Sequence, residues 1–321
     1  MNTKTSIVLG CSGQDGSLLC NSLVKKGEKV IGLTRSKQNQ IKNHIKLGIN
    51  KDVEIREGDI SRPETIQYLI DHYQPNSIFN LASQSSVGKS FSHPTETLKS
   101  IIDVTQNILE ISRKTKYNGK IFFAGSSEMF GNTEKAADIT HQQNPISPYA
   151  IAKQASFNLV KLYRELHEIN CVTGILFNHE SNLRNENFIS HKIILGAIEC
   201  SRNRLHKIKI GNMNIYRDWG WAEEYVEAIQ SINSSKKIKD YVVCTGKLTS
   251  MKDFIEIAFS KFDLNWKDHI VIDKKFIRKN DIKKSYGDPY PLSKDLNWKA
   301  KTYIEKIIEN IINEKTKYLQ F

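Results

Sequence analysis

The chain has 321 residues, a hydrophobic content of 39% and a formal net charge of +12. This length is enough for one large or two modest domains, and no apolar run in the sequence is long enough to span a membrane. The five cysteines form no CxxC pair and the nine histidines show no metal-ligand spacing. Both patterns disfavour a disulfide framework and a metal site, so we expect a reduced, cytoplasmic protein.

The positive charge is spread along the whole chain. Lysines are mixed with Asn, Ile and Glu, and the sequence contains no compact basic block interleaved with aromatic residues. We therefore expect neither a nucleic-acid partner nor a membrane partner. A positive field of this kind would instead attract a diphosphate ligand.

Short apolar runs alternate with helical patterns in the first half of the chain. The run nearest the N-terminus ends in glycines, which is typical of a first strand and not of a signal peptide. The candidate strands cover residues 6–9, 30–33, 53–56, 77–81, 120–124 and 172–177, and the candidate helices cover 17–26, 63–73, 94–114 and 148–167. This alternation predicts an α/β fold with a Rossmann-type, doubly wound parallel sheet that helices cover on both faces.

The pattern changes after about Asn178, where loops lengthen and the alternation stops. Residues 249–262 show a capping residue followed by an amphipathic helix. We predict a smaller, partly interleaved C-terminal domain that binds the substrate. The cofactor domain then comprises residues 1–177 and roughly 213–245, and the substrate domain comprises roughly 178–212 and 246–321.

The first predicted strand runs directly into GCSGQDG, which opens the first predicted helix. Gly10, Gly13 and Gly16 allow a tight turn and let the backbone approach a pyrophosphate, which the free N–H groups of the helix N-terminus then bind. A glycine pattern alone is weak, but its place between a strand and a helix is specific for a dinucleotide. We predict that Gln14 and Asp15 also contact this cofactor.

Three further strand ends complete the predicted cofactor site. Arg35 follows the second strand, where an acidic residue would bind the ribose of NAD and an arginine suits the 2′-phosphate of NADP. The alternative is that Arg35 is an ordinary surface charge, and we favour NADP. Asp59 follows the third strand and is placed to meet the adenine. The other predicted contacts at strand ends are Ile60, Leu81, Ala82 and Ser83.

The sequence SPYAIAKQ begins another predicted helix. Ser147 is a good N-cap and Pro148 a good first helical residue, which places Tyr149 and Lys153 one turn apart on the same face. Ser126 lies at the end of the preceding strand. This triple is the reactive set of the short-chain dehydrogenases, and the chain resembles the extended branch of that superfamily.

These residue types suit oxidation of an alcohol. A phenol is a poor base at neutral pH because its reference pKa is about 10. The Lys153 ammonium and a positive nicotinamide would both favour the phenolate of Tyr149, which takes a proton from a substrate alcohol as hydride leaves. Ser126 would hold the same oxygen. The alternative, a packed tyrosine beside a solvated lysine, is disfavoured by the nucleotide loop upstream.

Glu128 lies two residues beyond Ser126 on the same loop. Simple oxidation or reduction does not need a carboxylate there, but elimination of water beside a new ketone does. Oxidation of a sugar at C4 acidifies the proton at C5. Glu128 would remove that proton and then protonate the departing C6 hydroxyl, after which the hydride returns to C6. The alternative for Glu128 is a solvated loop charge.

These residues resemble GDP-mannose 4,6-dehydratase, and the similarity covers nearly the whole chain. SSEMFG resembles the catalytic segment of that family, with Ser126 in place of a threonine. GILFNHES and RDWG are far more specific than the superfamily motifs. The quoted motifs are GQDGSLL at 13–19, SSEMFG at 126–131, GILFNHES at 174–181, YRDWGWAEEYVEA at 216–228 and DLNWKAK at 295–301.

The resemblance implies a GDP-sugar 4,6-dehydratase, a lyase, that uses NADP and forms a homodimer or homotetramer. It assigns the C-terminal domain to the GDP-sugar, with Asn178 and His179 beside the nicotinamide or the sugar. Arg184 would reach NADP across a subunit interface. The implied cofactor contacts are Tyr149, Lys153, Leu176, His179 and Arg184. The implied substrate contacts are Ser85, Glu128, Asn178 and Glu180, with Asn187, Lys192, Arg217 and Arg278 on the GDP moiety.

The chain departs from the family pattern around the cofactor and the sugar. Residues 182–185 read NLRN where the family usually has Pro-Arg-Arg-Gly, and His191 stands in place of an arginine. Glu96, Trp221 and Ser36 replace a tyrosine, a histidine and a second arginine. These changes leave the sugar open between GDP-mannose, a GDP-manno-heptose and GDP-N-acetylglucosamine.

Two other functions are alternatives. The first is a reductase or epimerase of the same superfamily that acts on a GDP-keto-sugar, and Glu128 disfavours a plain reductase. The second is a non-catalytic nucleotide-binding regulator, which the intact set of Ser126, Tyr149 and Lys153 disfavours.

Overall fold

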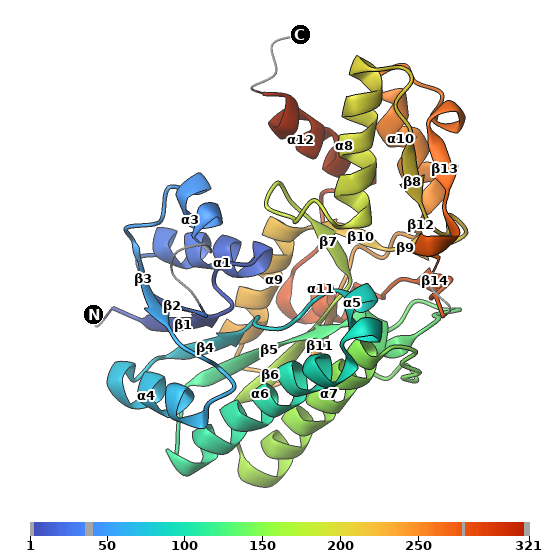
Figure 1. Cartoon of the computed structure of the whole chain (residues 1–321). Coiled ribbons are helices and arrows are strands. Elements are labelled where there is room, and N and C mark those ends of the chain that lie inside the picture. Colours follow the sequence, from blue (N-terminus) through green and yellow to red (C-terminus); the bar gives the residue numbers. More distant parts are fainter. Residues whose placement is uncertain (1–2, 36–40, 278–279, 318–321) are drawn as a thin grey trace.

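The computed structural model describes residues 3–35, 41–277 and 280–317. Within these residues the main sheet has seven parallel strands in the order β11–β6–β5–β4–β1–β2–β3 (Figure 1). The strands are β1 (Thr5–Leu9), β2 (Lys29–Thr34), β3 (Val53–Glu57), β4 (Ser77–Asn80), β5 (Lys120–Ser126), β6 (Cys171–Leu176) and β11 (Tyr241–Val243). The predicted doubly wound parallel sheet is confirmed.

Helices cover both faces of this sheet because successive strand residues point to opposite sides. Val8 packs in the core beneath α1 (Gln14–Lys25) and α9 (Ala222–Ser234). Its neighbours Ile7 and Leu9 pack in a second core on the other face. That face is covered by α4 (Pro63–Tyr73), α6 (Pro94–Lys114) and α7 (Pro148–His167), which lie along the lower side of the sheet in Figure 1.

The three helices predicted to begin at a proline have the predicted bounds. Strand bounds differ by one or two residues, and the largest difference is in β5. The apolar run ends at Ala124, but β5 continues to Ser126 because its last residues pair with β6, with Ser126 opposite Leu176. Pairing between strands therefore determines the end of β5, which the residue pattern within it does not mark.

Most of the remaining elements that follow β6 form a second layer around their own apolar core, in the upper right of Figure 1, whereas the short helices that precede β6 pack on the main sheet and its helices. The long helices of this layer are α8 (Ile189–Arg202), α10 (Met251–Ser260) and α12 (Ile304–Thr316). The short strands are β7 (Asn178–Glu180) with β10 (Trp219–Trp221), β8 (Ile208–Ile210) with β13 (Ile270–Ile272), and β9 (Tyr216–Arg217) with β12 (Thr249–Ser250) and β14 (Lys284–Ser285). The short helices are α3 (Lys42–Lys46), α5 (Val87–Ser92), α11 (Tyr290–Leu296), η1 (Ser127–Phe130), η2 (Trp266–Asp268) and η3 (Lys274–Phe276).

Two of the family-like motifs meet at the start of α9. The backbone carbonyl of Glu224 accepts a hydrogen bond from the Trp298 indole at 3.0 Å. Its carboxylate accepts from the Lys301 backbone N–H at 2.9 Å and from the Thr302 hydroxyl at 2.7 Å. Residues 298–302 are therefore fixed to the helix that covers β1, which gives DLNWKAK a structural role.

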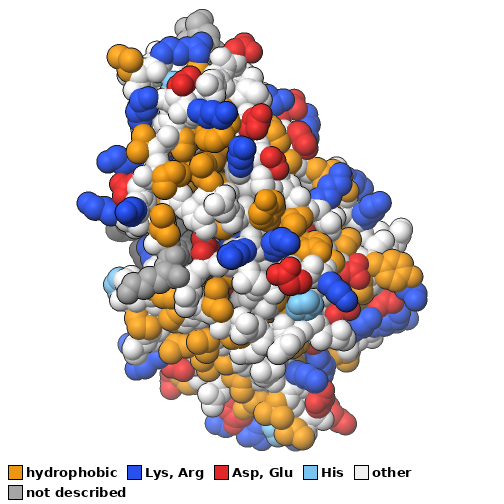
Figure 2. Space-filling model, turned by 90° about the vertical axis from the view of Figure 1, so that its right-hand side faces the viewer, with side chains coloured by type: hydrophobic (Ala, Val, Ile, Leu, Met, Phe, Trp, Pro, Cys, Tyr) orange, Lys and Arg blue, Asp and Glu red, His pale blue; other side chains and the backbone are white. Residues whose placement is uncertain are grey.

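The surface carries charges of both signs. On the face shown in Figure 2, Lys and Arg side chains are interspersed with acidic, apolar and other side chains. Across the described ranges, every helix falls short of the length and apolar character needed to cross a membrane.

A buried ion pair joins α7 to the strand at the edge of the sheet. Arg164 donates two parallel hydrogen bonds to Asp240, at 2.8 and 2.6 Å, and Asp240 also accepts from the Thr173 backbone N–H at 2.7 Å. Asp240 is almost fully buried. Removal of one partner would therefore leave a buried cation without its counter-charge.

We predict that Asp240→Asn lowers the free energy of unfolding by about 3 kcal/mol, because it breaks this buried pair. Glu199→Gln is the matched control, since Glu199 pairs with Arg202 on the exposed surface of α8 and its loss should cost less than about 1 kcal/mol. Urea unfolding followed by tryptophan fluorescence measures both. An effect of Asp240→Asn no larger than that of Glu199→Gln would contradict the prediction.

Candidate active site

The glycine loop lies between β1 and α1 at the carboxyl end of the sheet. Gly10 has a φ of +81°, and a Cβ there would lie 2.8 Å from the Ala82 backbone. A Cβ on Gly16 would lie 2.1 Å from the Gly10 carbonyl oxygen. At Gly13, the N-cap of α1, the nearest atom to such a Cβ is 3.5 Å away. The loop is thus close-packed at two glycines and open at the third, which fits a pyrophosphate at the helix N-terminus.

The short helix α3 supports this loop through two hydrogen bonds that were not predicted from the sequence. The Asn43 side-chain amide donates to the Ser12 carbonyl at 3.1 Å, and the His44 ring bonds to the Cys11 carbonyl at 2.8 Å. His44 is fully buried, and burial lowers its pKa, which favours a neutral ring. Neither residue belongs to a local motif, so the sequence holds no signal for this contact.

The predicted cofactor residues at the other strand ends line the same edge of the sheet. Arg35 is exposed directly after β2, and Ser36 lies outside the described residues. Asp59 accepts hydrogen bonds from the Ser61 backbone and hydroxyl at 2.9 and 2.7 Å. These bonds are the main cause of its lowered pKa, to which Arg62 and Arg35 also contribute. The half-buried residues Ile60, Leu81, Ala82 and Ser83 follow β3 and β4.

Tyr149 and Lys153 lie on the first turns of α7. The predicted cap is confirmed, because the Ser147 hydroxyl accepts from the Ala150 backbone N–H at 3.1 Å and Pro148 begins the helix. Tyr149 is 8% exposed, and the Ser126 hydroxyl lies close enough to it to lower its pKa. The structure therefore places the predicted catalytic tyrosine and serine side by side.

The pKa values of Tyr149 and Lys153 on α7 are both shifted toward the uncharged forms. Burial raises the pKa of Tyr149 to about 12, although Ser126 acts to lower it. Burial also lowers the pKa of Lys153 to about 8. The Lys153 ammonium donates to the Ala124 carbonyl at 2.8 Å and lies 5.8 Å from the centre of the Tyr149 ring. In this arrangement Tyr149 is a phenol, and further positive charge is needed to make it a base.

Glu128 is the half-buried residue of η1, whose other residues are buried. Met129 and Phe130 pack into an apolar core, which fixes the turn. The Glu128 backbone N–H donates to the Ser126 hydroxyl at 3.4 Å. The Glu128 carboxylate lies close enough to raise the pKa of Tyr149. The structure therefore brings Ser126, Glu128 and Tyr149 together.

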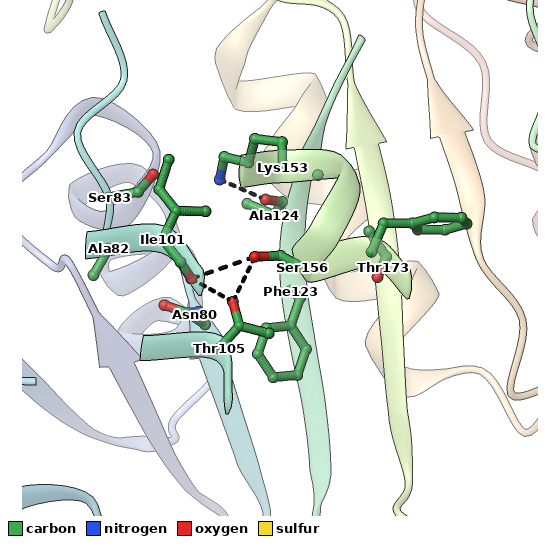
Figure 3. Close-up of a pocket in the computed structure, with 12 residues that line it drawn as sticks. Asn80, Ala82, Ser83, Ile101, Thr105, Phe123, Ala124, Lys153, Ser156 and Thr173 are labelled. Atoms are coloured by element: carbon green, nitrogen blue, oxygen red, sulfur yellow. Dashed lines mark hydrogen bonds between the residues drawn. The ribbon is translucent and has the colours of Figure 1, made fainter. Parts of the chain in front are cut away.

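A small cavity of about 20 Å³, room for about one water molecule, lies beside Lys153 beneath this set (Figure 3). Figure 3 shows hydrogen bonds that join α6 and α7 at this cavity. The Ser156 hydroxyl of α7 shares hydrogen bonds with the Thr105 hydroxyl, at 3.0 Å, and with the Ile101 carbonyl, at 3.3 Å, and the Thr105 hydroxyl lies 2.8 Å from the same carbonyl. These bonds fix the helix that carries Tyr149 and Lys153.

The β7 strand places further predicted residues over the first turn of α1. Asn178 is half-buried, and His179 and Glu180 are buried. The His179 ring lies 3.0 Å from both Asp15 carboxylate oxygens. Burial acts to raise the pKa of Asp15, but the charge and hydrogen bond of His179 outweigh it and lower this pKa to about 2. Leu176, the last residue of β6, is buried beneath the site.

The Arg184 side chain contacts residues of its own chain. Its Nε lies 3.5 Å from Glu180 Oε2, and its guanidinium lies 3.7 Å from the centre of the Phe188 ring. Burial is the main cause of the raised pKa of Glu180, and Arg184 opposes it. The expected contact of Arg184 with a neighbouring subunit stays a prediction.

The predicted GDP contacts lie on several elements of the second layer. Asn187 is exposed, as is Ser85 on the sheet side. The Lys192 ammonium, on α8, lies 4.0 Å from the centre of the Phe276 ring. Arg278 lies outside the described residues. Lys192 therefore lies against η3, shortly before the undescribed segment.

Arg217 is buried and already has protein partners. It donates to the Ile282 carbonyl at 2.7 Å and the Tyr216 carbonyl at 2.9 Å, and it forms an ion pair with Asp281 at 3.4 Å. The next residue, Asp218, accepts from the Thr245 backbone and hydroxyl at 2.9 and 2.6 Å. Burial raises the pKa of Asp218 to about 6. Asp218 lies within the RDWG motif, but the sequence assigned it no role, and its position between Arg217 and Trp219 was the signal for it.

A sequence model of GDP-mannose 4,6 dehydratase matches residues 7–311. The chain belongs to the GDP-mannose 4,6-dehydratase family. GDP-mannose 4,6 dehydratase 1 of Arabidopsis thaliana is 37% identical over 97% of this chain and 89% of its own length. GDP-mannose 4,6-dehydratase of Sinorhizobium fredii is 30% identical over 99% of this chain and 98% of its own length.

Solved structures of other nucleotide-sugar enzymes share the fold. The UDP-glucose 4-epimerase of Thermotoga maritima has a TM-score of 0.85 and 21% identity, covering 98% of this chain and all of that one. The dTDP-glucose 4,6-dehydratase of Bacillus anthracis, solved in complex with NAD, has a TM-score of 0.85 and 16% identity over 99% of this chain and 98% of that one.

We predict that Gly16→Ala disrupts the loop of this family member, because its Cβ would lie 2.1 Å from the Gly10 carbonyl oxygen. The expected cost is about 1–3 kcal/mol, with loss of the stabilisation that a bound nicotinamide cofactor gives. Gly13→Ala is the control for folding, since its Cβ meets nothing closer than 3.5 Å. Thermal unfolding without cofactor should separate the two variants, and equal melting temperatures would refute this reading of the loop.

Proposed function

We propose that this chain is a GDP-sugar 4,6-dehydratase that converts GDP-mannose, or a close GDP-hexose or heptose, to the 4-keto-6-deoxy sugar. The observation that carries the proposal is the half-buried Glu128, whose backbone N–H bonds to the Ser126 hydroxyl and whose carboxylate lies close enough to Tyr149 to raise its pKa. Full-length similarity to proteins named GDP-mannose 4,6-dehydratase supports the same reaction.

The first step is proton removal from the C4 hydroxyl. Tyr149 accepts this proton, and Ser126 holds the same oxygen as the carbonyl forms. A bound nicotinamide cofactor supplies the hydride acceptor at C4 and the donor at C6. Lys153 favours the phenolate only while it is charged, and its lowered pKa of about 8 leaves it largely charged at neutral pH.

The second step is the loss of water. The new C4 carbonyl acidifies the C5 proton, which Glu128 removes. The C6–oxygen bond then breaks as Glu128 returns that proton to the leaving hydroxyl, and a C5–C6 double bond forms. Addition of hydride at C6 and a proton at C5 completes the 6-deoxy sugar. The proton taken from C5 leaves with the C6 hydroxyl, so one carboxylate serves as both base and acid. The hydride taken from C4 returns to C6, so the reaction consumes no net reductant.

We further propose NADP as the cofactor. The exposed Arg35 follows β2 at the edge where the glycine loop lies, which suits a 2′-phosphate. The gap at Gly13 and the N-terminus of α1 would receive the pyrophosphate. Asp59 and the segment of Leu81 to Ser83 would line the rest of the cofactor.

On the substrate side, Lys192 and Arg217 would meet the diphosphate, together with Asn187 and Arg278. Cations of this kind suit a diphosphate. Because Arg217 is held by two carbonyls and Asp281, its guanidinium is already oriented before a ligand arrives. Asn178, Glu180 and Ser85 would contact the sugar.

We also propose a cytoplasmic homo-oligomer, dimer or tetramer. Five free, buried thiols suit a reducing compartment. Helix α7 exposes Ile151, Leu162 and Leu166, which supports burial of this helix against another subunit.

We predict that Glu128→Gln lowers dehydration about 10²–10⁴-fold, because an amide neither removes nor returns the C5 proton. Glu134→Gln on the following loop is the matched control, since Glu134 is 81% exposed. Mass spectrometry measures the loss of one water from the GDP-sugar, with NADP supplied and no system to regenerate it. Full activity of Glu128→Gln would exclude the dehydratase.

The same assay should be run with GDP-mannose, a GDP-manno-heptose and GDP-N-acetylglucosamine. Loss of water without net NADPH supports the dehydratase and identifies its sugar. An isomer of unchanged mass, separated from the substrate by chromatography, would instead indicate an epimerase, and turnover only of a GDP-keto-sugar with NADPH would indicate a reductase. No product with any of the three, despite bound NADP, would count against the proposal.

We predict that Arg35→Ala weakens NADP binding about 10–150-fold, the range expected for a lost charge-assisted bond of about 1.5–3 kcal/mol. NAD binding should change little, because NAD lacks the 2′-phosphate. Titration calorimetry with both cofactors tests this, and Arg113→Ala at the C-terminal end of α6 is the control. Equal losses for NADP and NAD would mean that Arg35 does not read the 2′-phosphate.

A further inference from the structure

The buried ring of His179 has an acceptor at each nitrogen. Nδ1 lies 2.7 Å from the Phe177 carbonyl oxygen, and Nε2 lies 3.0 Å from both oxygens of Asp15. A carbonyl oxygen only accepts, so Nδ1 carries a proton. An ionised carboxylate also only accepts, so Nε2 carries a second proton. With an ionised Asp15, His179 is therefore an imidazolium.

The other arrangement, a proton on Asp15 and a bare Nε2, is disfavoured by the surroundings of the carboxylate. Asp15 also accepts from the Gln14 side-chain amide at 3.0 Å. Arg184 acts to lower the pKa of Asp15, which favours an ionised carboxylate. It also acts to lower the pKa of His179, but the charge and hydrogen bond of Asp15 outweigh both this effect and burial, so that the pKa of His179 is raised. The other charged groups that act on the pair are Glu180 on β7, Glu223 on α9 and Lys153 on α7.

This pair joins two segments that are far apart in the sequence. Asp15 is on the first turn of the cofactor helix α1, and His179 is the central residue of β7. Gln14 adds two bonds, from its amide to the His179 carbonyl at 3.3 Å and from the Ser181 hydroxyl to its oxygen at 2.9 Å. The His179 ring also stacks on Tyr225 of α9 at 4.6 Å. The neighbours of His179 on β7 are Asn178 and Glu180, so the pair sets where these side chains lie.

The pair also affects the phenol of Tyr149. Taken alone, the Asp15 carboxylate raises the pKa of Tyr149 and so opposes formation of the base. A positive charge on His179, 3.0 Å from that carboxylate, offsets this effect.

We propose that Asp15 and His179 form a charged pair that positions β7 on the cofactor helix and compensates the Asp15 charge at Tyr149. The second part rests on the proposed role of Tyr149 as the base, whereas the first part does not. Asp15 and His179 are here positioning residues, which act through β7 and Tyr149.

The charge state can be read without any ligand or turnover. We expect ¹⁵N NMR of the ring-labelled full chain to show two protonated nitrogens on His179 from about pH 6 to about pH 8, whereas an unpaired histidine titrates in that range.

His44 and His191 are internal controls, since each ring bonds to one carbonyl oxygen, at 2.8 and 3.0 Å. Their other ring nitrogen is buried without a partner, so each should show one protonated nitrogen. Loss of the signals in His179→Gln assigns them. One protonated nitrogen on His179 at pH 7 would overturn the proposal.

Two variants then separate charge from packing. Asp15→Asn keeps a hydrogen-bond partner, since its amide can donate to Nε2, and His179 should become neutral in the same spectrum. His179→Gln leaves the Asp15 charge uncompensated, which raises the pKa of Tyr149. The acid limb of kcat against pH should then move upward by about 0.5–1 unit. The double variant, with neither charge, should move back toward wild type.

A purely structural role would lower kcat equally at every pH, and the double variant would not recover. That outcome would refute the compensation of charge and leave the NMR result standing. If the chain dehydrates none of the GDP-sugars, the pH profile has no activity to measure. The NMR comparison with His44 and His191 still decides whether the pair is charged, so failure of the proposed function is distinguishable from failure of this inference.

Discussion

The hydrogen-bond register of β5 is the constraint on which the rest of the site depends. Ser126 ends β5 opposite Leu176, which ends β6, so both reach the same edge of the sheet. Gly10 follows β1 at that edge, next to the strand where the chain reverses its direction of winding. A slip of one residue in β5 would turn the Ser126 side chain to the opposite face and separate it from Tyr149.

Burial shifts the pKa values of the reactive groups. It raises the pKa of Tyr149 to about 12, so the phenol is uncharged at neutral pH, and it lowers that of Lys153 to about 8, which still leaves Lys153 largely charged. Glu128, which is half-buried on a turn held by Met129 and Phe130, sits at the edge of this low-dielectric region. Because Lys153 alone does not make Tyr149 a base, the phenolate needs a further positive charge beside it.

The parts of the structure that were predictable from sequence are those that short-range chemistry determines. Ser147 and Pro148 mark the start of α7, and their spacing to Tyr149 places the tyrosine on the helix face that meets Ser126. Contacts between distant segments were not predictable. Asp15 and His179 meet only because β7 packs over α1, and no pattern within either segment encodes that meeting. The support that His44 gives the glycine loop is of the same kind, and two partners of Arg217, Asp281 and Ile282, come from the loop before β14, about 65 residues later.

The strand β11 has a consequence for how the chain folds during synthesis. It forms one edge of the main sheet and pairs with β6, yet it is made only after about three quarters of the chain. Helix α9, which covers the apolar face of α1 and β1, is made just before it. Until residues 222–243 leave the ribosome, β6 is an open edge and that face is uncovered. Such segments are sites of aggregation in nascent proteins, so chaperone contact during translation should be concentrated in this interval.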